Sequence, residues 1–178
     1  MEFIGLKKIW YGKSLTTEPK SHADVTALTT GEDFTEVKNV HDGTWSYTQD
    51  DPTITEYINM LSGQPYFREI TNAGNKTIAF TMGQYEFDDL VKLQGGEKVG
   101  TDGWKAGAPT FIKQAVIAQT KSGHYIVFSN AGIVAKTNAA EQNLGLGVTA
   151  VAMDNEDADI APEYRFKAAE EADITSRD

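Results

Sequence analysis

One glycine pattern in the chain has the spacing of a dinucleotide-binding site. Residues 145–150 read GLGVTA and match the G-x-G-x-x-A pattern, in which glycines let the backbone approach a pyrophosphate. That chemistry needs a strand before the pattern and a helix after it, so that the phosphates lie at a helix N-terminus. Here the polar sequence TNAAEQN precedes the glycines and the β-prone sequence VTAVAM follows them. We therefore predict that Gly145 and Gly147 let strands pack or bend, and that no nucleotide binds there.

An acidic cluster near the C-terminus comes closest to the composition of a metal site. Asp154, Glu156, Asp157 and Asp159 together offer oxygen ligands of the kind that calcium prefers. The segment lacks the loop glycine of an EF-hand, and Arg165 stands where the bidentate glutamate is needed. We interpret the cluster as a solvated acidic loop and predict no metal site.

Residues suited to acid–base or nucleophilic catalysis are scattered. His22, His41 and His124 lie far apart in the sequence, and none belongs to a zinc-binding pair. No G-x-S-x-G pattern marks a serine nucleophile. The carboxylate pairs Asp50-Asp51 and Asp88-Asp89 fit a strand end before proline and the first turn of a helix. We predict a protein that is not an enzyme and has no catalytic, cofactor-binding or metal-binding residues; a small hydrolase with a less obvious site is an alternative.

Composition limits the class of protein and its partners. The chain has 178 residues, 40% of them hydrophobic, which is typical of one globular domain. We place this domain at residues 1–168 and an acidic tail at residues 169–178. The net charge of −10 disfavours binding to nucleic-acid backbones and anionic membranes. The absence of cysteine excludes disulfides and thiolate catalysis, and we expect neither a signal peptide nor a membrane span.

The stretch Phe111–Met153 is the β framework of the chain. It carries β-branched and aromatic runs between short breaks, and Lys121-Ser122-Gly123 has the form of a three-residue hairpin loop. The strands predicted here are Ala115–Thr120, His124–Asn130, Ala131–Lys136 and Leu146–Met153. One face is predicted to contain Ala115, Ile117, Tyr125, Val127, Ile133, Val148 and Val151, with Gln114 and Gln119 on the other. Whether the first face is a core or lines a channel stays open.

Further strands are predicted outside this stretch. Asp42-Gly43 is typical of a hairpin turn between Glu36–Val40 and Thr44–Gln49, where Trp45 and Tyr47 share one face. The other predicted strands are Phe3–Lys13, for which a short helix is the alternative, Pro65–Thr71, Lys76–Met82 and Glu163–Phe166. We therefore predict a mainly β protein, a two-sheet β-sandwich or small barrel with one short flanking α-helix and long loops.

Two segments have the apolar spacing of a helix, and two have the composition of long loops. Glu86–Leu93 places Phe87, Leu90 and Val91 at helical spacing and ends before two glycines. Thr53–Leu61 is also predicted as a helix, with a strand as the alternative because of its Thr and Ile content. The predicted loops are Ser14–Thr35, in which a brief strand at Val25–Leu28 is an alternative, and Leu93–Pro109, and loops of this length are usually functional or mobile.

Six segments of the chain occur in a characteristic order: FIGLKKIWYGK, TWSYTQDDPTITEYINMLSGQPYFREI, TIAFTMGQYEFDDLVKLQGG, GHYIVFSNAGIVAK, GLGVTAVAM and APEYRF. This series, which extends over most of residues 3–166, resembles the major tail tube proteins of tailed bacteriophages and prophages, relatives of the contractile-injection tube proteins. The resemblance implies a β-sandwich or small barrel with one helix on its flank, matching Glu86–Leu93, and it implies no reactive site and no cofactor.

The same resemblance implies an assembly. In this family six copies close into a ring, their sheets join into one inner barrel, and rings stack into a tube around a tape-measure protein that later gives way to DNA. The implied partners are other copies of the chain, the tape-measure protein and other tail proteins, with DNA passing through the lumen without specific binding and no membrane contact. The implied location is the virion tail, assembled in the bacterial host cytoplasm.

The acidity of the chain fits that role. Six copies of −10 give about −60 per ring, and carboxylates facing a lumen would repel phosphate, so that DNA slides rather than binds. The competing prediction, from another class of protein, is a monomeric β-sandwich that binds carbohydrate or peptide through exposed Trp45, Trp104 or Tyr66.

Overall fold

The computed structural model describes residues 2–140 and 143–169, and it is mainly β, with 46% of residues in strands and 10% in helices. The strands are β1 (Lys8–Gly12), β2 (Phe34–Glu36), β3 (Ser46–Gln49), β4 (Thr53–Ile58), β5 (Pro65–Asn72), β6 (Lys76–Met82), β7 (Glu97–Val99), β8 (Gly103–Lys105), β9 (Ile112–Gln119), β10 (Tyr125–Ala140), β11 (Asn143–Ala152) and β12 (Glu163–Phe166). The helices are α1 (His22–Thr30) and α2 (Phe87–Leu93). Neither has the length and apolar character of a membrane-spanning helix.

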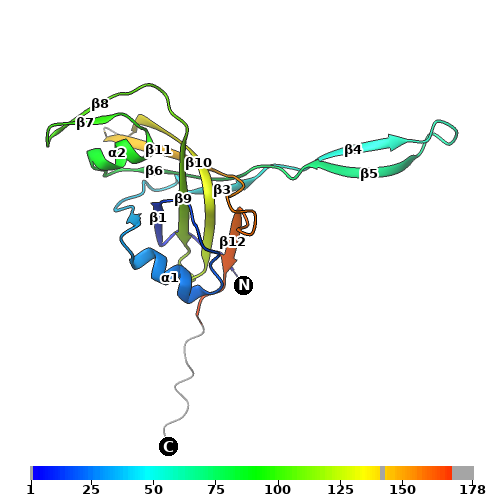
Figure 1. Cartoon of the computed structure of the whole chain (residues 1–178), viewed down its shortest axis with the longest axis horizontal. Coiled ribbons are helices and arrows are strands. Elements are labelled where there is room, and N and C mark those ends of the chain that lie inside the picture. Colours follow the sequence, from blue (N-terminus) through cyan, green and yellow to red (C-terminus); the bar gives the residue numbers. More distant parts are fainter. Residues whose placement is uncertain (1, 141–142, 170–178) are drawn as a thin grey trace, which may run out of the picture.

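Most strands belong to one antiparallel sheet that bends around a core. Its order is β2-β1-β9-β10-β11-β6-β3, and β12 pairs with the first part of β10. In Figure 1, β9 and β10 run down the body while β6 and β11 cross its top. Strands from both ends of the sheet, β1 and β6 among them, bury side chains in the same core. The sandwich predicted from the sequence is therefore confirmed, although one continuous sheet builds both of its layers.

A β-bulge in β10 changes which side chains face the core. Phe128 pairs with Val116 and Ala131 pairs with Gln114, so β10 advances three residues while β9 advances two. Before the bulge Ile126 and Phe128 point into the core, and after it Ala131 and Ile133 do. The two strands predicted on either side of Asn130 are thus one strand with a register shift.

The second face of β1, β9 and the start of β10 is also buried, because α1 packs there. Trp10, Ala115, Ile117, Tyr125 and Val127 form a second cluster with Val25 of α1, which is fully buried. The prediction that Ala115, Ile117, Tyr125 and Val127 share a face is confirmed. It was wrong for Ile133, which the bulge turns toward the other core, and for Val148, which lies in that core and, three residues from Val151 in β11, points to the opposite face of the strand from it.

Helix α1 was missed because its sequence is rich in threonine. Ser21 caps its start, accepting a hydrogen bond from the Asp24 amide at 3.2 Å, and Gly31 follows its last residue. The Thr26, Thr29 and Thr30 hydroxyls donate to backbone carbonyls within the helix, which uses polar groups that otherwise favour loops. The predicted Ser14–Thr35 loop therefore contains a helix that covers one sheet face.

Helix α2 was predicted correctly, and a buried carboxylate fixes its start. Asp89 accepts a hydrogen bond from the Glu86 amide at 2.7 Å and another from the Tyr11 hydroxyl of β1. Burial and the Asp89 carboxylate raise the pKa of Tyr11, so its hydroxyl remains a donor. Leu90 and Leu93 are buried as helical spacing requires, whereas Phe87 is 39% exposed, contrary to prediction.

Three other predictions were wrong. Thr53–Leu61 is not a helix but begins with strand β4, which was the alternative, and β4 is exposed on nearly all of its residues, so no buried face marks it in the sequence. Asp42-Gly43 makes a turn but no hairpin, because Val40 and β3 both pair with β6 instead of with each other. The Leu93–Pro109 loop contains the β7–β8 hairpin. Of the tail predicted at 169–178, residues 170–178 lie outside the described residues.

The Asp89 network makes a stability prediction. Replacing Asp89 by Ala should lower the free energy of unfolding by about 2–4 kcal/mol, because the helix loses its cap and the buried Tyr11 hydroxyl loses its acceptor. Urea denaturation measures the change. Asp88→Ala is the matched control, since Asp88 forms an exposed ion pair with Lys98 and should cost less than about 1 kcal/mol. Equal losses in the two variants would contradict the role assigned to Asp89.

Candidate functional site

The glycine pattern at 145–150 lies inside strand β11 and not before a helix. A Cβ on Gly145 would come within 2.8 Å of the Thr81 methyl group of β6, so the absence of a side chain allows the two strands to pair there. The interpretation of these glycines as strand geometry is confirmed.

The histidines serve structural contacts. His124 Nδ1 accepts a hydrogen bond from the Ala168 amide at 2.7 Å, and His22 Nε2 lies 3.3 Å from the Gly123 carbonyl oxygen. The structure thus brings His22 and His124 to the same hairpin turn, although they are far apart in the sequence. His41 Nε2 lies 3.2 Å from Nδ2 of the Asn143 side chain. Within residues 2–140 and 143–169, no group of three His, Asp or Glu side chains could hold a metal ion.

The acidic segment after β11 is a surface loop. The Asp157 amide donates to the Asn155 side chain at 3.2 Å, and the Asp159 amide donates to Asp157 at 3.0 Å. Glu156 forms an exposed ion pair with Lys113 at 3.4 Å. These carboxylates stabilise local turns and do not converge on one point.

A charged cluster that sequence reasoning missed joins the two halves of the sandwich. Glu163 of β12 is 6% exposed in its side chain and pairs with Lys76 of β6 and with Arg165 Nε at 2.7 Å. The Tyr47 hydroxyl of β3 donates to Glu163 at 3.1 Å and accepts from Arg165 at 2.8 Å. The sequence alone indicates only that Glu163 and Arg165 lie on the same side of β12. Lys76 and Tyr47 are distant in the sequence, and only the fold brings them into contact with Glu163. The cluster fastens β12 to β3 and β6.

Glu163 should make stability depend on pH. Burial raises the pKa of Glu163, but hydrogen bonds from Lys76 and Arg165 outweigh burial and hold it below its ordinary value of 4.5. Ionised Glu163 therefore stabilises the folded state above pH 4.5, and this contribution is lost as the pH falls through the lowered pKa.

Accordingly, Glu163→Gln should lower the free energy of unfolding by about 1–3 kcal/mol at neutral pH, and the difference from the parent should shrink at acid pH. Urea denaturation over a pH series measures both effects. Glu156→Gln, at an exposed ion pair, is the control and should change stability little. A difference between parent and Glu163→Gln that stays constant with pH would count against this assignment.

The half of the sheet formed by β3, β6, β11 and the end of β10 has one face that is exposed to solvent. This open face consists of side chains that point away from the core on β3, β6, β11 and the end of β10. Its residues are Ser46, Thr48, Thr77, Ala79, Thr81, Val134, Lys136, Asn138, Gly147 and Thr149, and all are exposed or half-buried. Nine are short and uncharged, Lys136 is the single charged residue, and none is a carboxylate. Such a face offers little for binding a specific ligand.

The same four strands end at two free edges. On one side, β3 pairs with β6 alone. On the other side, β10 pairs with β9 only as far as Ile133, so residues 134–140 have no strand beyond them among the described residues. Unpaired strand edges are templates for another strand. The layer β10-β11-β6-β3 can therefore be extended at both ends.

Strands β4 and β5 form an arm that extends far from the body of the molecule (Figure 1). We define the arm as residues 53–72. Its exposed apolar side chains are Ile54, Tyr57, Ile58, Met60, Leu61, Tyr66, Phe67 and Ile70, and Met60 and Leu61 at the tip are 97% and 98% exposed. An isolated two-stranded hairpin is marginally stable in water, and large exposed apolar patches occur commonly at protein–protein or membrane contact sites.

The aromatic residues predicted for a carbohydrate or peptide site do not come together. Trp45 and Trp104 are partly buried against the core, and the Trp104 indole N–H donates to the Gly95 carbonyl at 2.9 Å. Tyr66 is 69% exposed but lies on the arm. The three side chains form no shared platform for a ligand.

Comparison with known proteins adds no identity. No protein-family model matches the chain, and no curated protein is similar enough in sequence to count as a match. The open face, the two free edges and the arm are therefore the basis for assigning a function.

Proposed function

We propose that the protein is the structural subunit of a phage tail tube, in which six copies form a ring and rings stack into a conduit for DNA. The observation that carries the proposal is the four-stranded layer β10-β11-β6-β3, which has a free edge at each end. A subunit with two different free edges can join its neighbours head to tail, and such contacts close into a ring when the rotation allows it.

Strand direction is compatible with this joining. Each neighbouring pair in the layer is antiparallel, so β10 and β6 run one way and β11 and β3 run the other. Around a cyclic axis, β3 of one copy would therefore lie antiparallel to β10 of the next. The closed barrel would alternate strand direction throughout, with six copies of four strands.

In this arrangement the open face lines the lumen. Its Thr, Ser and Asn side chains are uncharged and therefore form weaker hydrogen bonds to a phosphate than arginine or lysine side chains would. The expected lumen carboxylates are not on this face, where Lys136 is the charged residue. Repulsion of DNA by the acidic subunit would then come from carboxylates at the ring openings and the loops, while the wall itself stays nearly neutral.

The arm supports stacking or neighbour contact. Its exposed apolar tip lies far from the core of its own subunit (Figure 1), where a second copy would cover it. The remaining partners, a tape-measure protein and other tail proteins, and the location in the virion after assembly in the bacterial cytoplasm follow from the same proposal. The proposed role requires no cofactor and no catalysis.

Cysteine cross-linking tests the edge pairing, because the natural chain has no cysteine. Thr48→Cys on β3 is combined in turn with Val134→Cys, Lys136→Cys and Asn138→Cys on β10. Opposed residues of paired strands have Cα atoms about 4.5–5.5 Å apart, within the range of a disulfide. We expect oxidation of one combination to give a ladder of covalent oligomers ending at six subunits, and negative-stain microscopy to show rings.

Two controls make this test decisive. Each single cysteine variant can form dimers at most, and Thr48→Cys with Lys20→Cys, which lies before α1, should form no ladder. A protein that stays monomeric at every concentration, without rings in the microscope, would overturn the proposal and favour the monomeric binding module.

The arm generates a separate prediction. Met60→Ser with Leu61→Ser should leave the stability of the subunit nearly unchanged, because both side chains are exposed in it. The concentration needed for tubes should rise about tenfold or more, since burying one such side chain contributes about 1.5–3 kcal/mol. Light scattering measures assembly, Ser62→Ala is the matched control, and unchanged assembly would show that the tip makes no contact.

A further inference from the structure

The chain contains two Asp-Gly pairs, Asp42-Gly43 and Asp102-Gly103, and the structure places them in different environments. In such a pair the backbone nitrogen of the glycine can approach the carboxyl carbon of the aspartate, because glycine has no side chain that obstructs it. Whether this happens in a folded protein depends on three things. The carboxyl group must be free, the glycine nitrogen must be free, and the backbone between them must be able to rotate.

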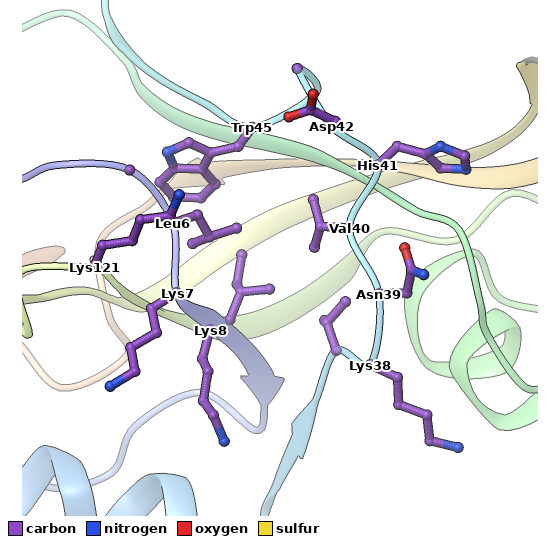
Figure 2. A pocket seen from close by; sticks show the side chains of 14 residues that line it. Leu6, Lys7, Lys8, Lys38, Asn39, Val40, His41, Asp42, Trp45 and Lys121 are labelled. Atoms are coloured by element: carbon purple, nitrogen blue, oxygen red, sulfur yellow. The ribbon is translucent and has the colours of Figure 1, made fainter.

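The carboxylate of Asp42 is free. It is exposed at the rim of a pocket of about 430 Å³ between the N-terminal segment and the turn before β3 (Figure 2). It forms no ion pair and no hydrogen bond within residues 2–140 and 143–169. Figure 2 shows that the side chain of His41 points away from Asp42, so the neighbouring imidazole does not hold the carboxylate.

The backbone nitrogen of Gly43 is also free. The His41 amide donates to the Thr81 carbonyl at 2.9 Å and the Thr44 amide donates to the His41 carbonyl at 3.3 Å, but the Gly43 amide has no acceptor in the part of the chain that the structure describes. A Cβ on Gly43 would meet no atom within 4 Å, so the space around the residue is open. Nothing packed against this turn prevents the backbone from rotating.

The second Asp-Gly pair is restrained by the β7–β8 hairpin. Gly103 is the first residue of β8 and lies opposite Val99 of β7. A Cβ on Gly103 would come within 2.9 Å of the Val99 carbonyl oxygen, so the glycine backbone is in close contact with the neighbouring strand. Rotation between Asp102 and Gly103 would disrupt this strand pairing. The chain therefore carries the same dipeptide in a free and in a restrained setting.

We propose that Asp42 is a site of spontaneous isomerisation to isoaspartate. The Gly43 nitrogen forms a bond to Cγ of Asp42 while the bond between Cγ and the hydroxyl of the neutral carboxyl group breaks. The hydroxyl leaves with the amide proton as water, and a cyclic imide remains. Water then opens the imide at either carbonyl carbon, which restores aspartate or directs the main chain through the side-chain carbon. No oxidant, reductant or cofactor takes part.

Isomerisation loosens the connection between this turn and the edge strand β3. The Thr44 hydroxyl donates to the His41 carbonyl at 2.7 Å and accepts from the Thr81 amide at 3.1 Å, which fastens the turn to β6. An isoaspartate adds a carbon atom to the main chain between His41 and Thr44, and the lengthened turn strains both hydrogen bonds. Strand β3 begins at Ser46, directly after this turn, and has a free edge. The site belongs to the single subunit and does not require the proposed function.

Peptide mapping of the full-length, folded protein after incubation in heavy-oxygen water tests the site, because opening of the imide introduces one solvent oxygen. We expect heavy oxygen and isoaspartate to accumulate several-fold faster at residue 42 than at residue 102. In urea the two pairs should react at similar rates, since the restraint on Gly103 is then lost. Gly43→Ala should slow the reaction at residue 42 several-fold, because its side chain obstructs the nitrogen.

Hydrogen exchange measures the structural consequence. Protein enriched in isoaspartate at residue 42 by incubation should exchange amides several-fold faster in residues 44–49 and 76–82 than fresh protein. Asp42→Glu is the matched control, because its longer side chain closes an imide ring much more slowly while the charge and the glycine of the turn are kept. After the same incubation, this variant should exchange as the fresh protein does.

Two results would overturn the proposal. Isoaspartate that forms in the folded protein no faster at residue 42 than at residue 102 would show that the turn at Asp42 is not a favoured site. Unchanged exchange in residues 44–49 of the isomerised protein would show that β3 does not depend on this turn. Both readouts are made on the subunit, so a failure to form rings would leave them unaffected.

Discussion

Strand β10 runs through both halves of the sheet. The bulge at Ser129 and Asn130 makes this possible because it changes which of its side chains face the core. Both residues are buried, so every polar group that the bulge frees from the sheet needs a partner. The loops provide them: the Ser129 carbonyl accepts from the Leu15 amide, the Ser129 amide donates to Pro162, and the Asn130 side chain binds Ser14 and Asp154. Three distant segments are thereby tied to one point of one strand.

The two halves of the sheet have different environments as a consequence. Before the bulge, β10 lies between β9 and β12, and both faces are buried by the core and by α1. After it, β10 continues past the end of β9 and leaves an open face and a free edge. In the proposed tube, the buried first half would hold the subunit together, and the second half would be free to pair with neighbouring copies.

Charged side chains have different roles in the buried core and on the exposed surfaces. The buried carboxylates, Asp89 and Glu163, each fasten one element to the sandwich through hydrogen bonds from neighbouring strands. The open face has Lys136 as its single charged residue, and the arm exposes a row of large apolar side chains beside the Arg68–Glu56 ion pair. In the proposed tube, the wall and the contact arm are therefore separate surfaces of a single acidic subunit.

Local patterns in the sequence determined the mainly β class, strands such as β6 and β12, the glycine turn at Gly123 and helix α2. Each of these depends on residues that are neighbours in the chain or on alternation against one core. Only the tertiary structure decided the bulge, helix α1, the Glu163 cluster, the free edges and the arm. The bulge is stabilised by loops at residues 14–15 and 154–162, which are distant in the sequence. Helix α1 is stabilised by a sheet face that its own sequence does not reveal. The edge of β10 is free because no strand pairs with it after Ile133 among the described residues. Strand β5 was predicted, as Pro65–Thr71, but residues 53–61 have apolar residues at helical spacing, and only the fold shows that the two segments pair into an arm that packs on no core of its own subunit.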